Sequence, residues 1–122
     1  NESGDHNPMT MTERQVGPVK VLSLAGKLTL DDAGQLKGKV TELVGAGQKQ
    51  LVLNLADVTF IDSSGLGEMV SCHTTASRAQ GAVKLAHLGK RSQDLLVITK
   101  LNMVFDVYNS ESEAVESFTS SV

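Results

Sequence analysis

The stretch that decides the fold is an aliphatic run ending in a small, polar turn: Gln50-Leu51-Val52-Leu53-Asn54-Leu55-Ala56-Asp57-Val58-Thr59-Phe60-Ile61-Asp62-Ser63-Ser64-Gly65-Leu66-Gly67. Residues 50–55 are short, aliphatic and preceded by a glycine loop, which predicts a strand at the centre of a sheet. After the turn, Leu66, Met69 and His73 recur at helical spacing, so we expect a helix to follow directly.

On the amino-terminal side, Gly17-Pro18 separates a sparse apolar segment, 11–16, from a strand-like run, 19–25. Because such a dipeptide marks a turn, we expect a hairpin whose first strand lies at the edge of the sheet. The following segment predicts a helix that ends at 45–47 and carries the acids at 31–32 in its first turn. Its apolar face is expected to comprise Ala33, Leu36, Val40, Leu43 and Val44.

On the carboxyl-terminal side, strands and helices continue to alternate. We expect a strand at 82–86, a helix at 93–100, a strand at 103–108 and a closing helix after Ser110, whose spacing to Glu113 is that of a capping box. This alternation predicts βα units and parallel strands. The fold class is therefore α/β, with a mixed sheet made of an N-terminal hairpin followed by βα units.

The size of the chain, 122 residues with 40% apolar residues, fits one domain. We place this domain at 10–122 and interpret the polar residues 1–9 as a disordered leader or remnant outside the fold. The chain has no Trp, and its aromatic residues are Phe60, Phe105, Tyr108 and Phe118. We therefore expect an aliphatic core.

Charge and residue usage exclude several functions. The formal charge of -3 argues against a nucleic-acid binder, because such domains are basic. A single cysteine, Cys72, allows no internal disulfide, and no apolar run is long enough to span a bilayer. Three histidines and one cysteine provide no spaced ligand pairs for structural zinc. We expect a cytoplasmic protein without membrane insertion, metal or cofactor.

The motif at 62–67 allows three interpretations. Ser63 or Ser64 could simply be the N-cap of the following helix. The helix start could instead bind a phosphate, but the P-loop lysine is missing and no Lys or Arg follows until Arg78. In the third interpretation, an exposed serine accepts a phosphoryl group from a kinase.

Catalysis by this turn fails on spacing. A hydrolase elbow requires glycine two residues before the serine, where this chain has Ile61. His73 lies on the apolar face of its helix and is expected to be a satisfied, partly buried residue. Cys72 has no cation nearby in the sequence and is expected to be a buried, inert thiol. The chain is therefore predicted not to be an enzyme.

The segments 51–55 and 57–67 closely resemble the STAS domain family, named after sulfate transporters and anti-sigma factor antagonists. The resemblance runs from about Val16 to Phe118 and includes Leu24-Ala25-Gly26-Lys27-Leu28 and Phe105-Asp106-Val107-Tyr108. With its intact Asp-Ser-Ser-Gly-Leu-Gly motif, the chain is similar to the stand-alone bacterial anti-sigma factor antagonists of partner-switching systems.

The resemblance implies a regulator that binds an anti-sigma factor when unphosphorylated and thereby frees a sigma factor. The anti-sigma factor is itself a serine/threonine kinase that ends the interaction by phosphorylation, and a phosphatase resets the switch. By motif position the acceptor is Ser63, with Ser64 as its neighbour and Asp62 orienting the cap. Leu66, Gly67 and Met69 are expected near the docking surface, where small Gly65 and Gly67 let the partner approach closely.

The chain departs from the family pattern in one place. The aspartate that usually follows the Gly-x-Leu turn is replaced by Thr29, and Asp31 and Asp32 lie further along. Thr29 and Asp31 are nevertheless predicted to contact the partner, although first-turn acids also have a structural explanation. The alternative function is that of a STAS scaffold in a transport or lipid-trafficking assembly, without control by phosphorylation.

Overall fold

The computed structural model describes residues 9–29 and 34–119. Along the chain the elements are β1 (Thr10–Val16), β2 (Val19–Leu28), α1 (Gln35–Gly45), β3 (Gln50–Ile61), α2 (Ser63–Arg78), β4 (Ala82–Ala86), α3 (Lys90–Ile98), the 3-10 helix η2 (Leu101–Met103), β5 (Val107–Tyr108) and α4 (Glu111–Thr119). The strands form one sheet in the order β1-β2-β3-β4-β5, in which only the β1–β2 pair is antiparallel. The predicted α/β class, the hairpin and the parallel strands that follow it are confirmed.

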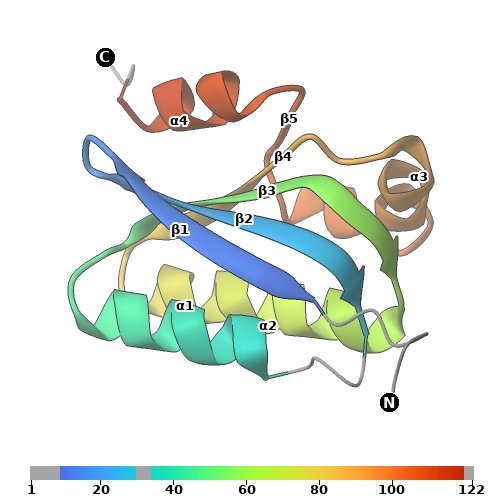
Figure 1. Ribbon diagram of the computed structural model, residues 1–122, viewed down its shortest axis with the longest axis horizontal. Helices are drawn as coiled ribbons and strands as arrows, with labels where there is room; N and C mark the ends of the chain where they lie inside the picture. Colours follow the sequence, from blue (N-terminus) through green and yellow to red (C-terminus); the bar gives the residue numbers. More distant parts are fainter. Residues whose placement is uncertain (1–8, 30–33, 120–122) are drawn as a thin grey trace.

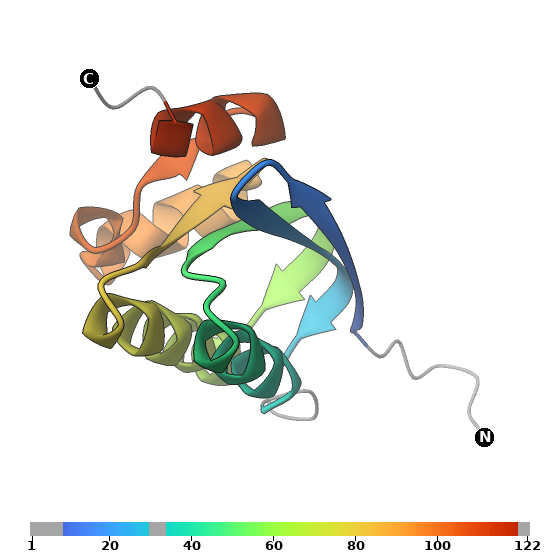
Figure 2. The same cartoon turned by 90° about the vertical axis from the view of Figure 1, so that its left-hand side faces the viewer.

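Helices cover both faces of the sheet (Figures 1 and 2). Alternate residues of a strand point to opposite faces, and in β3 Leu51 and Leu53 join the large core under α1 and α2, whereas Val52 joins a smaller core under α4. The core is aliphatic as expected, because Phe105 is the one aromatic residue buried among those that the structure describes. Met9, expected in the leader, is buried in the large core, so the fold begins before residue 10.

Strand β3 is longer than the sequence indicates and is irregular. Its pairing with β2 shifts between Gly26↔Val58 and Lys27↔Phe60 and, earlier in the strand, between Ser23↔Asn54 and Ala25↔Asp57; at each place β3 has one more residue than its partner. The Asn54 side chain accepts a hydrogen bond from the backbone N–H of Ala56 at 3.0 Å, which satisfies an amide at the bulge. Beyond this bulge β3 continues to Ile61 and leads into α2.

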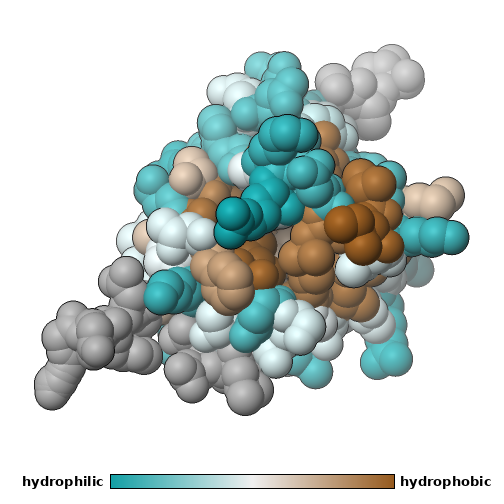
Figure 3. All heavy atoms as spheres, turned by 90° about the vertical axis from the view of Figure 1, so that its right-hand side faces the viewer, coloured by the Kyte–Doolittle hydropathy of each residue, from teal (hydrophilic) through white to brown (hydrophobic). Residues whose placement is uncertain are grey.

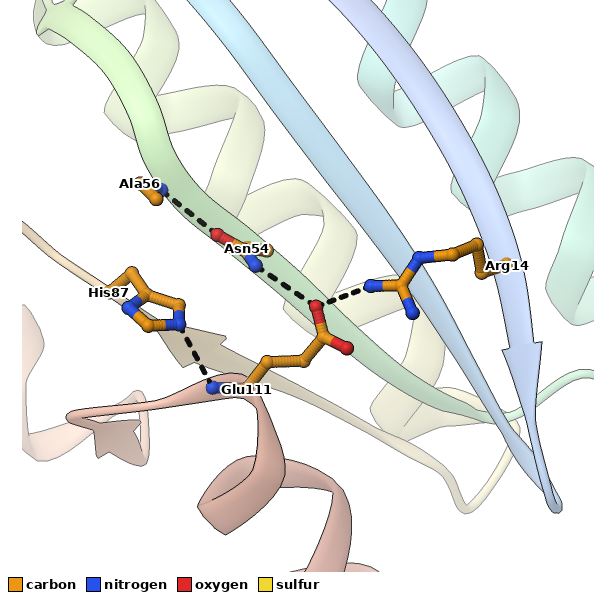
Figure 4. A network of polar contacts seen from close by, with 5 residues as sticks. All are labelled: Arg14, Asn54, Ala56, His87 and Glu111. Carbon is orange, nitrogen blue, oxygen red and sulfur yellow. Dashed lines mark hydrogen bonds and ion pairs between the residues drawn. The ribbon is translucent and has the colours of Figure 1, made fainter.

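A polar network attaches α4 to the sheet (Figure 4). The Glu111 carboxylate at the start of α4 accepts hydrogen bonds from the side chains of Arg14 on β1 and Asn54 on β3. The backbone N–H of Glu111 donates to Nε2 of His87 at 3.2 Å. Glu111 therefore links α4 to two strands, β1 and β3, and to the residue that directly follows β4. As predicted, Ser110 caps this helix by accepting from the Glu113 N–H.

The segment between α3 and α4 differs from its prediction. The strand expected at 103–108 is reduced to β5, and the 3-10 helix η2 precedes it. The apolar residues Met103 and Val104 are exposed, so the apolar run that suggested a strand is not buried in the sheet. Likewise α3 begins at Lys90, earlier than the expected residue 93, and its N-cap residue is Gly89.

Candidate partner-binding site

The turn from β3 to α2 is fixed to the end of β2. Asp62 is the N-cap of α2, and its Oδ1 accepts a hydrogen bond from the Gly65 N–H at 2.8 Å. The backbone N–H of Asp62 donates to the Leu28 carbonyl at 3.2 Å. The prediction that Ser63 or Ser64 is the N-cap is therefore wrong. Three consecutive residues here are good capping residues, and their sequence alone does not distinguish them.

With Asp62 as the cap, Ser63 becomes the first residue of α2. Its side chain is exposed, whereas that of Ser64 is half-buried. Within the described ranges, the Ser63 hydroxyl makes no hydrogen bond. Ser63 therefore presents a free hydroxyl at a helix start, where the helix dipole favours negative charge.

The two glycines of the motif have different surroundings. A Cβ atom on Gly65 would lie 2.3 Å from the Leu28 carbonyl oxygen, whereas one on Gly67 would meet nothing within 4 Å. Gly65 is buried against β2, so the expectation that it lets a partner approach closely is wrong. Gly67 is exposed and lies one helical turn beyond Ser63.

Two residues expected near the docking surface lie on the inward face of α2. Leu66 is 7% exposed and Met69 is 0% exposed, and both belong to the large core. Their side chains support the motif from beneath, so the surface around Ser63 must be made by other residues. The amphipathic spacing that predicted the helix already favoured this position.

The structure describes only part of the β2–α1 connection. Thr29 is half-buried and directly follows Leu28, whose carbonyl oxygen contacts the motif. Asp31 and Asp32 lie outside the described residues, so the place of Asp31 relative to Ser63 stays a prediction. Since α1 begins at Gln35, its first turn contains no acid, and the expectation that residues 31–32 fill that turn is wrong.

Sequence reasoning missed Glu68, which caps a helix other than its own. Its Oε2 atom accepts hydrogen bonds from the backbone N–H groups of Gly34 and Lys37, at 2.6 and 2.9 Å. Glu68 is 6% exposed, and the N-cap residue of α1, Gly34, has no side chain for the task. The carboxylate thus links α2 to the start of α1. A glycine where a capping residue is expected is the one sequence signal for this contact.

Cys72 and His73 of α2 both lie at least partly buried within the fold. Burial, with a smaller contribution from the negative charge of Glu68, raises the pKa of Cys72 to about 12. Cys72 is thus the buried, unreactive thiol that was predicted. His73 is half-buried as expected and packs edge-on against Phe105. Its Nδ1 atom has no hydrogen-bond partner among the described residues, so the side chain is not fully satisfied there.

Beside Ser63 the surface is hollowed into a groove of about 600 Å³. Its walls are the end of β3, residues 58–61, and α3 with Gly89, and Ser63 lies among its lining residues. Figure 3 shows apolar side chains gathered on the side of the molecule that holds α3 and the end of β3. Phe60 and Ile98, which line the groove, are exposed. Residues 9–29 and 34–119 contain no cluster of potential metal ligands and no helix that is long and apolar enough to cross a membrane.

The family model for the STAS domain matches residues 10–114. The chain belongs to the STAS family. The STAS domain is 31% identical over 86 residues to the anti-sigma-B factor antagonist of Bacillus subtilis, covering 70% of this chain and 78% of the relative. TM1081 of Thermotoga maritima, classed by name with the anti-sigma factor antagonists, superposes with a TM-score of 0.83 at 27% identity, over 88% of this chain and 92% of the other.

Bacillus SpoIIAA has the same fold in two states. Its phosphorylated form superposes on the STAS domain with a TM-score of 0.72 at 19% identity, over 89% of this chain and 99% of the other. Its unphosphorylated form superposes with a TM-score of 0.73 at 16% identity, over 93% of this chain and 100% of the other. At this identity the likeness concerns the fold alone.

Proposed function

We propose that this STAS domain is an anti-sigma factor antagonist of a partner-switching system. The observation that carries the proposal is the free, exposed hydroxyl of Ser63 at the first position of α2, within the Asp-Ser-Ser-Gly-Leu-Gly motif. The 31% identity to the anti-sigma-B factor antagonist of Bacillus subtilis supports it. The partner is an anti-sigma factor that is also a serine/threonine kinase, and the switch operates in the cytoplasm.

In this switch the unphosphorylated domain binds the anti-sigma factor and frees a sigma factor. The kinase then transfers the γ-phosphoryl group of ATP to Oγ of Ser63, with loss of the hydroxyl proton and formation of ADP. A phosphatase hydrolyses the phosphoserine and restores the hydroxyl. The domain contributes an acceptor and a surface, while the chemistry belongs to its partners.

Charge explains why phosphorylation ends the interaction. A phosphate adds about -1.5 to -2 charges at pH 7, whereas the whole chain carries a formal charge of -3. The new charge lies on the residue that follows the acidic Asp62 in the chain, at a position that lines the groove. A partner surface that fits the neutral serine is therefore opposed by the phosphate, because binding would require the dianion to lose its water and to approach nearby negative charge.

Incubation with candidate anti-sigma kinases and ATP, followed by intact mass measurement and site mapping, tests the proposal. We expect one phosphate on Ser63, none on Ser63→Ala, and unchanged phosphorylation of Ser64→Ala. Ser63→Asp should bind the kinase more weakly than Ser63→Ala does. Absence of both kinase binding and phosphorylation would contradict the proposal and favour the scaffold function. Modification of Ser64 alone would refute the choice of residue but not the switch.

A further inference from the structure

The groove beside Ser63 is apolar and open to solvent. Among its lining residues, Phe60 is 44% exposed and Ile98 is 76% exposed. Apolar side chains that meet around a concave surface mark interaction sites more often than single exposed ones do. Ser63 lines the same groove, so a partner that contacts the serine also lies next to these apolar residues.

One wall of the groove is a strand with a free edge. Strand β4 pairs with β3 only from Gln50↔Ala82 to Asn54↔Ala86. Beyond Asn54, β3 pairs with β2 alone, as far as Ile61. In the described part of the chain, no backbone hydrogen bond joins residues 57–61 to α3. A strand paired on one side leaves N–H and C=O groups unpaired at its other edge. Residues 58–61 line the groove, so this edge faces it, and the bulge at Thr59 interrupts the regular alternation of these groups.

The opposite wall carries positive charge. Lys90 and Arg91, both exposed, begin α3 and line the groove together with a single acid, Asp94. The Lys90–Asp94 pair is 3.7 Å apart and both side chains are largely exposed, so it is weak. Arg91 has no ion pair among the residues described. A net positive groove wall on a chain of charge -3 favours an acidic partner segment.

We infer that the groove binds an extended segment of the anti-sigma kinase that pairs with the free edge of β3. Its apolar side chains contact Phe60 and Ile98, and an acidic residue contacts Lys90 and Arg91. Main-chain pairing with an exposed sheet edge, with side-chain pockets for specificity, is a general mode of peptide recognition. A phosphate on Ser63 competes with that acidic residue for the same cations. This inference rests on the proposed function and adds the place and form of docking.

Binding of the full-length kinase to Ile98→Glu, measured by calorimetry, tests the groove. The matched control is Val97→Glu, since Val97 is also exposed on α3 but lines a separate cavity with Asn102 and Val107. We expect affinity to fall by roughly tenfold or more for Ile98→Glu and to stay within roughly twofold for Val97→Glu. Equal thermal unfolding of the two variants establishes that both are folded.

Hydrogen exchange on the complex tests the strand pairing. We expect slower exchange of backbone amides at 57–61 in the wild-type complex and no such slowing with Ile98→Glu. If Ile98→Glu binds like the wild type while Ser63 is still phosphorylated, the groove assignment is wrong and the proposed function stands. If the wild-type chain neither binds the kinase nor is phosphorylated by it, both the groove assignment and the proposed function are wrong. If Ile98→Glu instead dissolves a dimer in sedimentation equilibrium and leaves kinase binding intact, the occupant is a second copy and our inference is wrong.

Discussion

At Gly65, the absence of a side chain is a packing requirement. The Leu28 carbonyl oxygen occupies the place where a Cβ atom would lie, at 2.3 Å, and the Asp62 side chain accepts from the Gly65 N–H on the same turn. The motif therefore fixes the start of α2 against the end of β2. Its glycine keeps Ser63 at a fixed position relative to the end of β2.

We predict that Gly65→Ala and Gly67→Ala have opposite effects on stability. Gly65→Ala should lower the free energy of unfolding by about 2–3 kcal/mol, because the backbone of β2 must move. Gly67→Ala, with no atom within 4 Å of the new Cβ, should raise it by about 0.5–1 kcal/mol, because alanine favours the helix. Urea unfolding of both variants measures the difference, and equal effects would show that close approach to Leu28 is not limiting.

Individual residues of the site were only partly predictable from the sequence. The motif located the start of α2 to within one or two residues. It did not identify Asp62 as the cap, because Asp and Ser cap equally well. Nor did it show that Met69 is fully buried, because a residue near a motif along the chain can still lie on the opposite face of the helix.

At the scale of elements, α1 and α2 depend on each other through Glu68. A buried carboxylate that accepts from two backbone amides of another helix replaces the local cap that Gly34 lacks. Gly34 itself has a φ of 101°, a conformation that glycine adopts readily. The start of α1, next to the connection that carries Asp31, is thereby linked to the helix that begins with Ser63.

We predict that Glu68→Ala loosens the start of α1. The loss of two partly buried hydrogen bonds should lower the free energy of unfolding by about 1–3 kcal/mol and speed amide exchange at Lys37. Glu68→Gln, which keeps a carbonyl oxygen, should have a smaller effect. Glu42→Ala, on the exposed face of α1, is the control. If Glu68→Ala and Glu42→Ala unfold alike, Glu68 is not the cap.

The type of an element was predictable where the apolar pattern of the sequence is buried in the structure. The prediction was wrong where an apolar run is exposed. Strands β2 and β3 and helix α2 follow apolar patterns that are buried in the structure. The run at 103–108 has a strand composition, yet Met103 is 83% exposed. Periodicity does not reveal whether an apolar run is covered, so η2 and the groove beside Ser63 could not be predicted from the sequence.

At the scale of the molecule, the two faces of the sheet have separate roles. The face under α1 and α2 holds the larger core and presents Ser63 at its edge. The other face is covered by α4, which the Arg14–Glu111–Asn54 network attaches to β1 and β3. Arg14 lies near the beginning of the fold and Glu111 near its end, so this network joins the two ends of the domain.

We predict that this network makes stability depend on pH. Partial burial raises the pKa of Glu111, but the hydrogen bonds from Arg14 and Asn54 and the charges of Arg14 and His87 together lower it more, so the folded pKa lies below its ordinary value. Such a group stabilises the fold above its unfolded pKa, and that contribution is lost as pH falls through the folded pKa. Glu111→Gln should therefore be less stable than wild type by about 1 kcal/mol at pH 7, with the gap closing below about pH 4.

Thermal unfolding between pH 3 and pH 7 measures this dependence. The control is Glu113→Gln, which lies in the same first turn of α4 and is exposed. It should follow the wild-type pH profile. A gap between Glu111→Gln and wild type that is constant over the whole range would contradict the role of the charged carboxylate.

The measurement that tests the central claim most directly is the affinity of an anti-sigma kinase for the chain before and after stoichiometric phosphorylation of Ser63. We predict that the kinase binds the unphosphorylated chain and that phosphorylation weakens binding by roughly a hundredfold, which corresponds to about 2.7 kcal/mol. Ser63→Ala should bind like the unphosphorylated wild type even after incubation with kinase and ATP. Equal affinity of the kinase for the phosphorylated and unphosphorylated chains would contradict the account.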